Sequence, residues 1–204
     1  EMRDVTKTFP GVVALDQVSI RVRKGEAHAL IGENGAGKST LMKILSGIYQ
    51  ANEGEILLDG QPTIIAGVKD AQEKGISIIT QEFNLINTLS VAENIFLGRF
   101  SGSNVVNWRQ ITRQAEELLE NLGFSLKVSR IVGKLSAAEK QLVEIAKALS
   151  FDSRIIVMDE PTSSLTKHEE EMLFAIISTL KAKQITTIYI SHKLEEVFRI
   201  CDTV

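Results

Sequence analysis

A glycine-rich segment that ends in lysine and serine carries the clearest chemistry in this sequence. Residues 32–40 read GENGAGKST, and the spacing G-x-x-x-x-G-K-S is that of loops whose backbone amides wrap phosphate groups. Lys38 supplies a compact cation for terminal phosphates, and the Ser39 hydroxyl is a ligand for Mg²⁺. A plain glycine turn between a strand and a helix would not require this Lys-Ser pair. The sequence therefore predicts a site for ATP and Mg²⁺ built from Asn34, Gly35, Ala36, Gly37, Lys38, Ser39 and Thr40.

A pair of acids follows an apolar run later in the chain. Residues 155–158 read IIVM and lead directly into Asp159, Glu160 and Pro161. Because ligands of open α/β sheets bind beyond the carboxyl ends of the strands, we expect Asp159 in the magnesium shell and Glu160 beside an attacking water. The alternative is that both acids lie in a solvated turn before the proline.

Two weaker candidates follow the other apolar runs. Gln81 comes after residues 76–80, and its amide is suited to the metal or to the attacking water. His192 comes after residues 186–190, and its imidazole is suited to the γ-phosphate. Taken alone, each is more often a turn residue with local hydrogen bonds. Together with the glycine-rich loop, they favour one phosphate site at one edge of a sheet.

The elements that position these side chains follow from hydrophobic patterning. Four short apolar runs have the β-branched character of buried parallel strands, at residues 27–31, 75–80, 154–158 and 186–190. Amphipathic stretches between them, such as 167–183, predict helices and therefore an α/β architecture. A helix is also expected after the loop, over 39–46. Shorter strand patterns at 18–22, 55–58 and 62–65 predict an antiparallel layer.

The middle of the chain is predicted to be a helical subdomain. Residues 107–122 carry apolar side chains on one helical face, with Asn107 as the cap and Gly123 as the stop. This region interrupts the strand series, so we interpret 84–153 as helical and 1–83 with 154–204 as the catalytic core. The 204 residues then form one nucleotide-binding domain.

Composition excludes several functional classes. The net charge is −3 and the basic residues are scattered, which argues against a nucleic-acid partner. Cys201 is the single cysteine, which fits a reducing compartment. The longest apolar run, 172–177, is far shorter than the ~20 residues of a membrane span. A strand pattern starts near 201–204, so we expect the sequence to be a piece of a longer polypeptide.

The order of these motifs resembles the ATP-binding cassette family. It runs from the glycine-rich loop through Gln81, the LSAAE segment at 135–139 and the paired acids to His192. The resemblance implies a P-loop NTPase core of RecA-like type with an antiparallel layer and an inserted helical subdomain. It implies that adenine stacks on Phe9, that Glu160 is the catalytic base and that His192 senses the γ-phosphate. It also implies two segments that contact a partner cassette: Ser136, Ala137, Ala138 and Glu139, which complete the partner's ATP site, and Ser163, Ser164, Leu165 and Thr166, the D-loop.

Five longer sequence segments resemble the N-terminal cassette of sugar-importer ATPases. The segments are KTFPGVVALD, GENGAGKSTLMKILSGIYQ, SVAENIFLGR, VEIAKALS and MDEPTSSLT. This resemblance implies a second cassette in the same full-length chain, a transmembrane permease facing residues 81–97, and a sugar-binding protein outside the cell. It implies a peripheral position at the cytoplasmic face of the membrane.

The LSAAE segment departs from the family's usual Leu-Ser-Gly-Gly-Gln. Glycines let backbone amides approach a phosphate closely, whereas Ala137 and Ala138 add β-carbons. Glu139 adds an anion that opposes phosphate binding if it faces the nucleotide. It also fits a simpler role, an S-x-x-E capping box with Ser136 for a helix over 137–149. We therefore hypothesise two unequal ATP sites, with the weaker one completed by this segment.

Three other functions compete with a transport ATPase. A soluble cassette protein acting on DNA or ribosomes would be expected to show a basic surface run, which the sequence lacks. A P-loop kinase fits poorly with Glu160 beside Asp159, because adjacent acids and the LSAAE segment favour attack by water. A nucleotide-binding regulator with little turnover remains an alternative because the signature is altered.

Overall fold

The four predicted buried runs form one parallel sheet in the computed structural model, which describes residues 1–99 and 107–204. The strand order is β3-β8-β7-β6, and every neighbouring pair is parallel. The strands are β3 (Ala27–Leu30), β6 (Ile76–Ile79), β7 (Ile155–Asp159) and β8 (Thr186–Ile190). Each agrees with its predicted run to within one residue at either end. Their carboxyl ends meet at one edge, where the predicted site residues follow.

A second, antiparallel sheet has the order β2-β1-β4-β5 and confirms the predicted side layer. Its strands are β1 (Met2–Phe9), β2 (Val12–Ile20), β4 (Glu53–Leu58) and β5 (Gln61–Pro62). The sequence patterns missed β1, started the second strand at 18 rather than at Val12, and made the last strand, predicted at 62–65, too long. In β1 the register shifts between Met2 and Val5. The buried positions are therefore three residues apart, and the period-two pattern of a strand is hidden.

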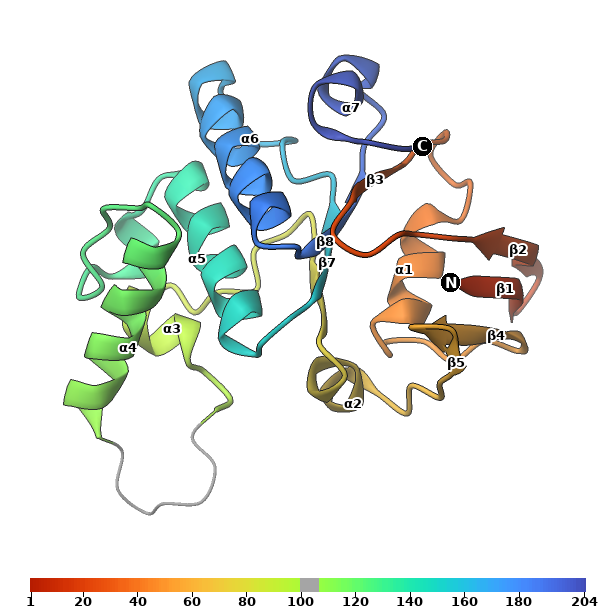
Figure 1. The fold of residues 1–204 in the computed structure, drawn as a ribbon, viewed down its shortest axis with the longest axis horizontal. Helices are drawn as coiled ribbons and strands as arrows, with labels where there is room; N and C mark the ends of the chain where they lie inside the picture. The colour runs from red at the N-terminus through yellow and green to blue at the C-terminus, as the bar shows by residue number, and fades with distance from the viewer. Residues whose placement is uncertain (100–106) are drawn as a thin grey trace.

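Helix α1 (Lys38–Leu45) lies between the two sheets, as Figure 1 shows. Its buried side chains pack on both sides, against Met2 and Val5 of the antiparallel sheet and against Val157 and Ile188 of the parallel sheet. This apolar cluster fixes the direction of α1. The helix therefore starts directly after the glycine-rich loop with its N-terminus at the sheet edge.

Four helices cover the other face of the parallel sheet and the region beside it (Figure 1). They are α3 (Val91–Ile95), α4 (Trp108–Asn121), α5 (Ala137–Ser150) and α6 (Lys167–Ala182), with a short 3₁₀ turn at Val132–Lys134. Asn107 caps α4 by accepting a hydrogen bond from the Gln110 amide at 3.2 Å, as predicted. Gly123 then adopts φ +80°, a left-handed conformation that suits glycine after a helix.

The predicted helical region 84–153 contains α3, α4 and α5, while residues 100–106 of it lie outside the described part of the chain. Division into a core and a helical subdomain stays a prediction. Two short helices were not predicted, α2 (Val68–Glu73) and α7 (Leu194–Ile200). Near the chain end, Thr203 pairs with His28 of β3 in parallel. Within the described residues, no helix is both long enough and apolar enough to cross a membrane.

Candidate nucleotide-binding site

A cavity of about 460 Å³ lies at the carboxyl edge of the parallel sheet. It brings together the glycine-rich loop, the segment after β6 and the end of β7, which are far apart in sequence. The lining residues are Val12, Val13, Ala14, Asn34, Gly35, Ala36, Gly37, Lys38, Ser39, Thr40, Gln81, Asp159 and Glu160. All seven predicted loop residues, Gln81 and both acids therefore share one cavity.

The start of α1 is shaped for an anion. Gly37 is its N-cap and adopts φ +86°, and a β-carbon there would lie 2.6 Å from the Ala14 carbonyl oxygen and 2.7 Å from a Leu15 methyl carbon. Only glycine fits such a contact without a shift of the backbone. No side chain caps α1, and its first turn contains no acid. The positive end of the helix dipole is therefore not offset by a carboxylate of the helix itself.

Lys38 folds back over the loop. Its Nζ donates hydrogen bonds to the carbonyl oxygens of Gly32 at 2.6 Å and Glu33 at 2.9 Å. An ammonium group has three donors and makes strong bonds to phosphate oxygens. The loop thus holds the cation at the cavity, where phosphate oxygens can exchange with the two carbonyl groups.

Glu160 and His192 are joined across the ends of β7 and β8. The Glu160 backbone has φ +48°, an unusual value for a residue other than glycine, and its amide donates to the Ile190 carbonyl oxygen at 3.0 Å. Its carboxylate Oε1 lies 3.1 Å from Nδ1 of His192. Such left-handed conformations cluster at functional sites. His192 is absent from the cavity lining itself, and it reaches the cavity through Glu160.

The oxygen donors at the cavity fit Mg²⁺ shared with a phosphate. Ser39 offers a hydroxyl, Gln81 an amide carbonyl and Asp159 a carboxylate, all lining the same space. Magnesium in nucleotide sites usually takes one or two carboxylates together with phosphate oxygens. Within the described residues, no group of three or more His, Cys, Asp or Glu side chains is placed to hold a metal. A protein-only metal cage is therefore not the arrangement seen at this edge.

Phe9 is not brought into this cavity. Its ring packs edge-on against Tyr49, with centroids 5.3 Å apart and planes at 72°, and the Lys7 ammonium lies 5.2 Å from its centre. The stacking of adenine on Phe9 stays a prediction. Sequence reasoning missed three lining residues, Val12, Val13 and Ala14, of which Val12 and Val13 are largely exposed. The sequence shows them only as an apolar run after Gly11, which does not distinguish a ligand-facing strand from an ordinary one.

The altered signature forms the predicted capping box. Ser136 is the N-cap of α5 and accepts the Glu139 amide at 3.3 Å, while the Glu139 carboxylate accepts the Ser136 amide at 2.9 Å. The same carboxylate forms an ion pair with Arg130. Partial burial raises the pKa of Glu139, but the hydrogen bonds from Arg130 and the Ser136 amide outweigh it, so the pKa lies below its ordinary value. Glu139 is therefore an anion held at the first turn of α5.

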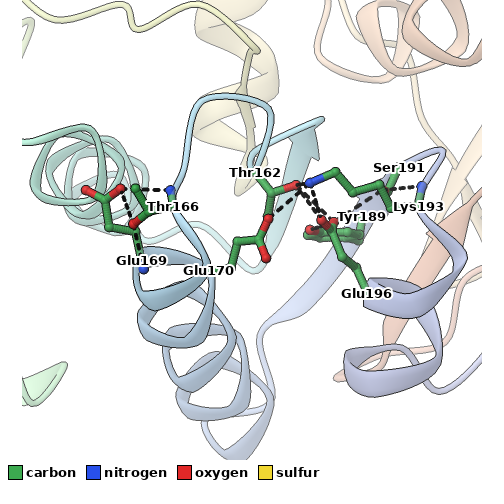
Figure 2. Close-up of polar contacts among 8 residues, drawn as sticks. All are labelled: Thr162, Thr166, Glu169, Glu170, Tyr189, Ser191, Lys193 and Glu196. Carbon is green, nitrogen blue, oxygen red and sulfur yellow. Dashed lines mark hydrogen bonds and ion pairs between the residues drawn. The ribbon is translucent and has the colours of Figure 1, made fainter.

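A second carboxylate reaches the same helix start. Thr166 and Glu169 form the capping box of α6, shown in Figure 2, and Glu169 Oε1 also accepts the Ala138 amide at 3.3 Å. The predicted D-loop, 163–166, leads into this box through hydrogen bonds from the Ser163 amide to Glu160 O and from the Leu165 amide to Thr162 O. The segment that contains the signature and the D-loop are thus linked within one chain through Glu169.

Fold and site together define the class of protein. A parallel sheet, a glycine-rich loop that opens α1, and a Glu160 carboxylate at the same edge are the parts of a P-loop nucleotide-binding protein. A family model described as ABC transporter matches residues 15–163. The chain belongs to this family, whose members bind nucleotide, and it has the fold of an ABC ATPase cassette.

Curated relatives are similar over the whole of this chain. A ribose import ATP-binding protein of Clostridium perfringens is 49% identical over 209 residues, covering 100% of this chain and 41% of the relative. A xylose import ATP-binding protein of Moorella thermoacetica is 50% identical over 207 residues, covering 100% of this chain and 41% of the relative. The chain therefore spans about two fifths of the length of the curated relatives it matches.

A solved structure agrees in fold. The ADP conformation of an ATP-binding cassette of an ABC transporter has a TM-score of 0.88 at 30% identity, covering 98% of this chain and 84% of that one. A dimeric bacterial ABC transporter cassette has a TM-score of 0.81 at 26% identity, covering 97% of this chain and 90% of that one.

Proposed function

We propose that this chain is the ATP-hydrolysing nucleotide-binding domain of a membrane importer for a monosaccharide, with ATP held between it and a second cassette. One observation carries the proposal: the cavity that contains Lys38 and Ser39 also contains Glu160. Lys38 and the loop amides bind the phosphates, and Glu160 orients and deprotonates the attacking water. His192 lies 3.1 Å from Glu160 and supports the same water and the γ-phosphate.

Ser39, Gln81 and Asp159 are proposed to hold Mg²⁺ together with phosphate oxygens. The ion, when bound, would neutralise charge on the phosphates. These three side chains also restrict where the terminal phosphate lies in the cavity, since each lines it. Asp159 and Glu160 are adjacent in sequence, so metal binding and water activation are positioned by one strand end.

The second cassette is proposed to contact the α5 N-terminus and the D-loop. A solved cassette that resembles this chain is dimeric, and the inferred pairing here uses Ser136, Ala137, Ala138 and Glu139 with Ser163, Ser164, Leu165 and Thr166. In this pairing the glycine-rich loop of each chain faces the α5 start of the other. Because the Ser136 amide already binds the Glu139 carboxylate and the Ala138 amide already binds the Glu169 carboxylate, the two ATP sites are unequal.

A groove away from the ATP cavity is proposed to receive the permease. It has a volume of about 240 Å³, and it is lined by Thr80 and Asn84 after β6 and by Glu144 and Lys147 of α5. The Glu144 carboxylate accepts the Asn84 amide at 2.5 Å, and burial raises the pKa of Glu144. Since the groove begins beside Gln81, movement of a permease segment in it would reach the ATP cavity. This contact would place the chain at the cytoplasmic face of the membrane.

Monosaccharide import is supported by the similarity to ribose and xylose import ATP-binding proteins. A sugar-binding protein outside the cell would act indirectly through the permease. The specific test is purification of the intact complex, followed by a binding screen of pentoses and hexoses on its receptor. Selective binding of one monosaccharide is the expected result, and binding of only peptides, ions or vitamins would contradict sugar import.

The amides at the α5 start are already bound by Glu139 and Glu169. This observation favours one alternative function, a nucleotide-binding regulator with little turnover. Steady-state phosphate release by the full-length protein with its permease separates the two functions, with Glu160→Gln as the matched variant. We expect Glu160→Gln to lower kcat by about 10² to 10⁴-fold because it removes the base. ATP affinity should change less than threefold, because binding rests on the loop. A wild-type rate no higher than that of Glu160→Gln would favour the regulator.

A further inference from the structure

A buried carboxylate lies behind the catalytic edge and is not used in the proposed chemistry. Glu196, in the first turn of α7, is only 4% exposed. Burial of an ionised carboxylate is costly unless donors surround it. The side chains that donate hydrogen bonds to Glu196 therefore indicate its role in the fold.

Four side chains donate to Glu196, as Figure 2 shows. The Thr162 hydroxyl lies 2.8 and 3.0 Å from the two carboxylate oxygens, and the Tyr189 hydroxyl lies 2.7 Å from Oε2. The Ser191 hydroxyl donates at 3.2 Å, and the Lys193 ammonium lies 2.8 Å from Oε1. Burial raises the pKa of Glu196, but the bonds from Lys193, Tyr189 and Thr162 outweigh it and hold the pKa below its ordinary value. The carboxylate is therefore ionised at neutral pH.

The donors come from the two segments that carry the catalytic pair. Thr162 is two residues after Glu160, and Ser191 and Lys193 are the neighbours of His192 on either side. The Ser191 hydroxyl also accepts the Lys193 amide at 3.0 Å, which closes a tight turn around His192. Lys193 further pairs with Glu170 of α6 at 3.0 Å.

His192 itself has little else to hold it. Its side chain is 58% exposed, whereas that of Glu160 is 20% exposed, and Nδ1 of His192 lies 3.1 Å from the Glu160 carboxylate. An exposed imidazole keeps one position only if its backbone is fixed. The backbone turn that carries His192 is held by the Glu196 carboxylate, which binds the side chains of Ser191 and Lys193.

We propose that Glu196 is a positioning residue that holds the turn of His192 against the segment of Glu160, and so sets the distance between these two groups. The inference rests on the proposed ATP hydrolysis. Glu196 acts on the reaction only through His192 and Glu160, because its contacts are with Thr162, Tyr189, Ser191 and Lys193. Preorganised supporting groups of this kind matter because small displacements of reacting groups cost rate.

The test is a double-mutant cycle in the full-length protein with its permease. Glu196→Gln keeps the size of the side chain but removes its charge and one acceptor. We expect kcat for ATP hydrolysis to fall about 10-fold to 100-fold, with KM for ATP within twofold of wild type. In a His192→Ala background, the same Glu196→Gln change should alter kcat less than twofold, because the group it positions is gone. Equal losses in both backgrounds would overturn the proposal.

The matched control is Glu171→Gln. Glu171 forms a two-bond ion pair with Arg199 at 2.7 Å, which joins α6 to α7 at the exposed surface, whereas Glu196 is buried. Its loss loosens the same two helices, so kcat should stay within twofold of wild type. A loss of kcat equal to that of Glu196→Gln would show that helix docking, and not the turn of His192, matters.

An activity-independent measurement separates this proposal from the proposed function. The ¹H–¹³C NMR signal of the His192 ring, assigned by its absence in His192→Ala, should shift in Glu196→Gln and stay in place in Glu171→Gln. If wild type hydrolyses no ATP, the proposed function fails while this signal still decides the positioning role. Should Glu196→Gln fold poorly, Thr162→Val removes the donor near Glu160 with similar shape, and it should shift the same signal. An unmoved signal in folded variants would overturn the positioning role.

Discussion

The N-termini of α1 and α5 differ in whether their backbone amides are free to bind an anion. The start of α1 has glycine as its cap, no side-chain cap and no acid in its first turn. The start of α5 has a serine cap and Glu139 in a capping box, and its Ala138 amide is bound by Glu169. Both present backbone amides and a positive dipole end. One is open to a phosphate, while the other is already occupied by carboxylates of its own chain.

A helix start can therefore bind an anion only where its backbone amides are not already hydrogen-bonded within the chain. A capping box stabilises a helix by about 1 kcal/mol because it satisfies amides that have no helical partner. The same bonds compete with an incoming phosphate. We therefore infer that the chain gains stability at α5 at the expense of anion binding there, whereas α1 keeps its amides available and depends on its packing between two sheets.

Removal of the cation at the open start should have the largest effect. Lys38→Ala deletes the ammonium that now bonds to Gly32 and Glu33, and each lost charge-assisted bond to phosphate costs about 1.5 to 3 kcal/mol. We expect the Kd for Mg-ATP to rise at least tenfold, measured by titration calorimetry. Lys69→Ala, which removes an exposed lysine of α2 that does not line the cavity, is the charge-matched control. An affinity for Mg-ATP within twofold of wild type in Lys38→Ala would contradict the assignment of the α1 start as the phosphate site.

Removal of the serine cap at the start of α5 should have a smaller effect, which we expect on the stability of this chain. Ser136→Ala deletes the hydroxyl that accepts the Glu139 amide, so the free energy of unfolding should fall by about 1 kcal/mol. Urea unfolding followed by the fluorescence of Trp108, the single tryptophan of this chain, measures the change.

Ser178→Ala is the control for that change. Ser178 lies inside α6 and donates to the Phe174 carbonyl oxygen, a bond that adds little to a helix. This variant should be neutral or slightly more stable than wild type. If both serine variants lose the same stability, the cap at α5 does not have the role described here.

The parallel sheet, the glycine-rich loop and the S-x-x-E box could be predicted because each depends on neighbouring residues. Apolar runs of four residues define buried strands, and Ser136 with Glu139 needs only its own helix. The predicted sequence order also placed Gln81, Asp159 and Glu160 in one cavity, since parallel strands end at one edge.

Other features depend on contacts that no local pattern records. The first strand was missed because a shift in register near Asp4, which has φ +48°, breaks its alternation. α7 was missed because Glu196 looks like an exposed helix acid, although its donors bury it. The Glu169 bond to Ala138 joins residues 31 apart in sequence. Such contacts appear only once the helices are packed.

The central claim is that the α5 start of this chain completes an ATP site poorly. The most direct measurement uses the full-length protein with Glu160→Gln in this cassette, so that remaining phosphate release reports the partner's loop completed by this α5. Into it, Ala137→Gly, Ala138→Gly and Glu139→Gln are introduced together. The variant removes the negative charge of Glu139 and two β-carbons from the α5 start, so that its amide donors can approach a phosphate more closely. Such donors are worth about tenfold or more in rate, so we predict that phosphate release rises by about that factor. An unchanged rate in a folded variant would contradict the account.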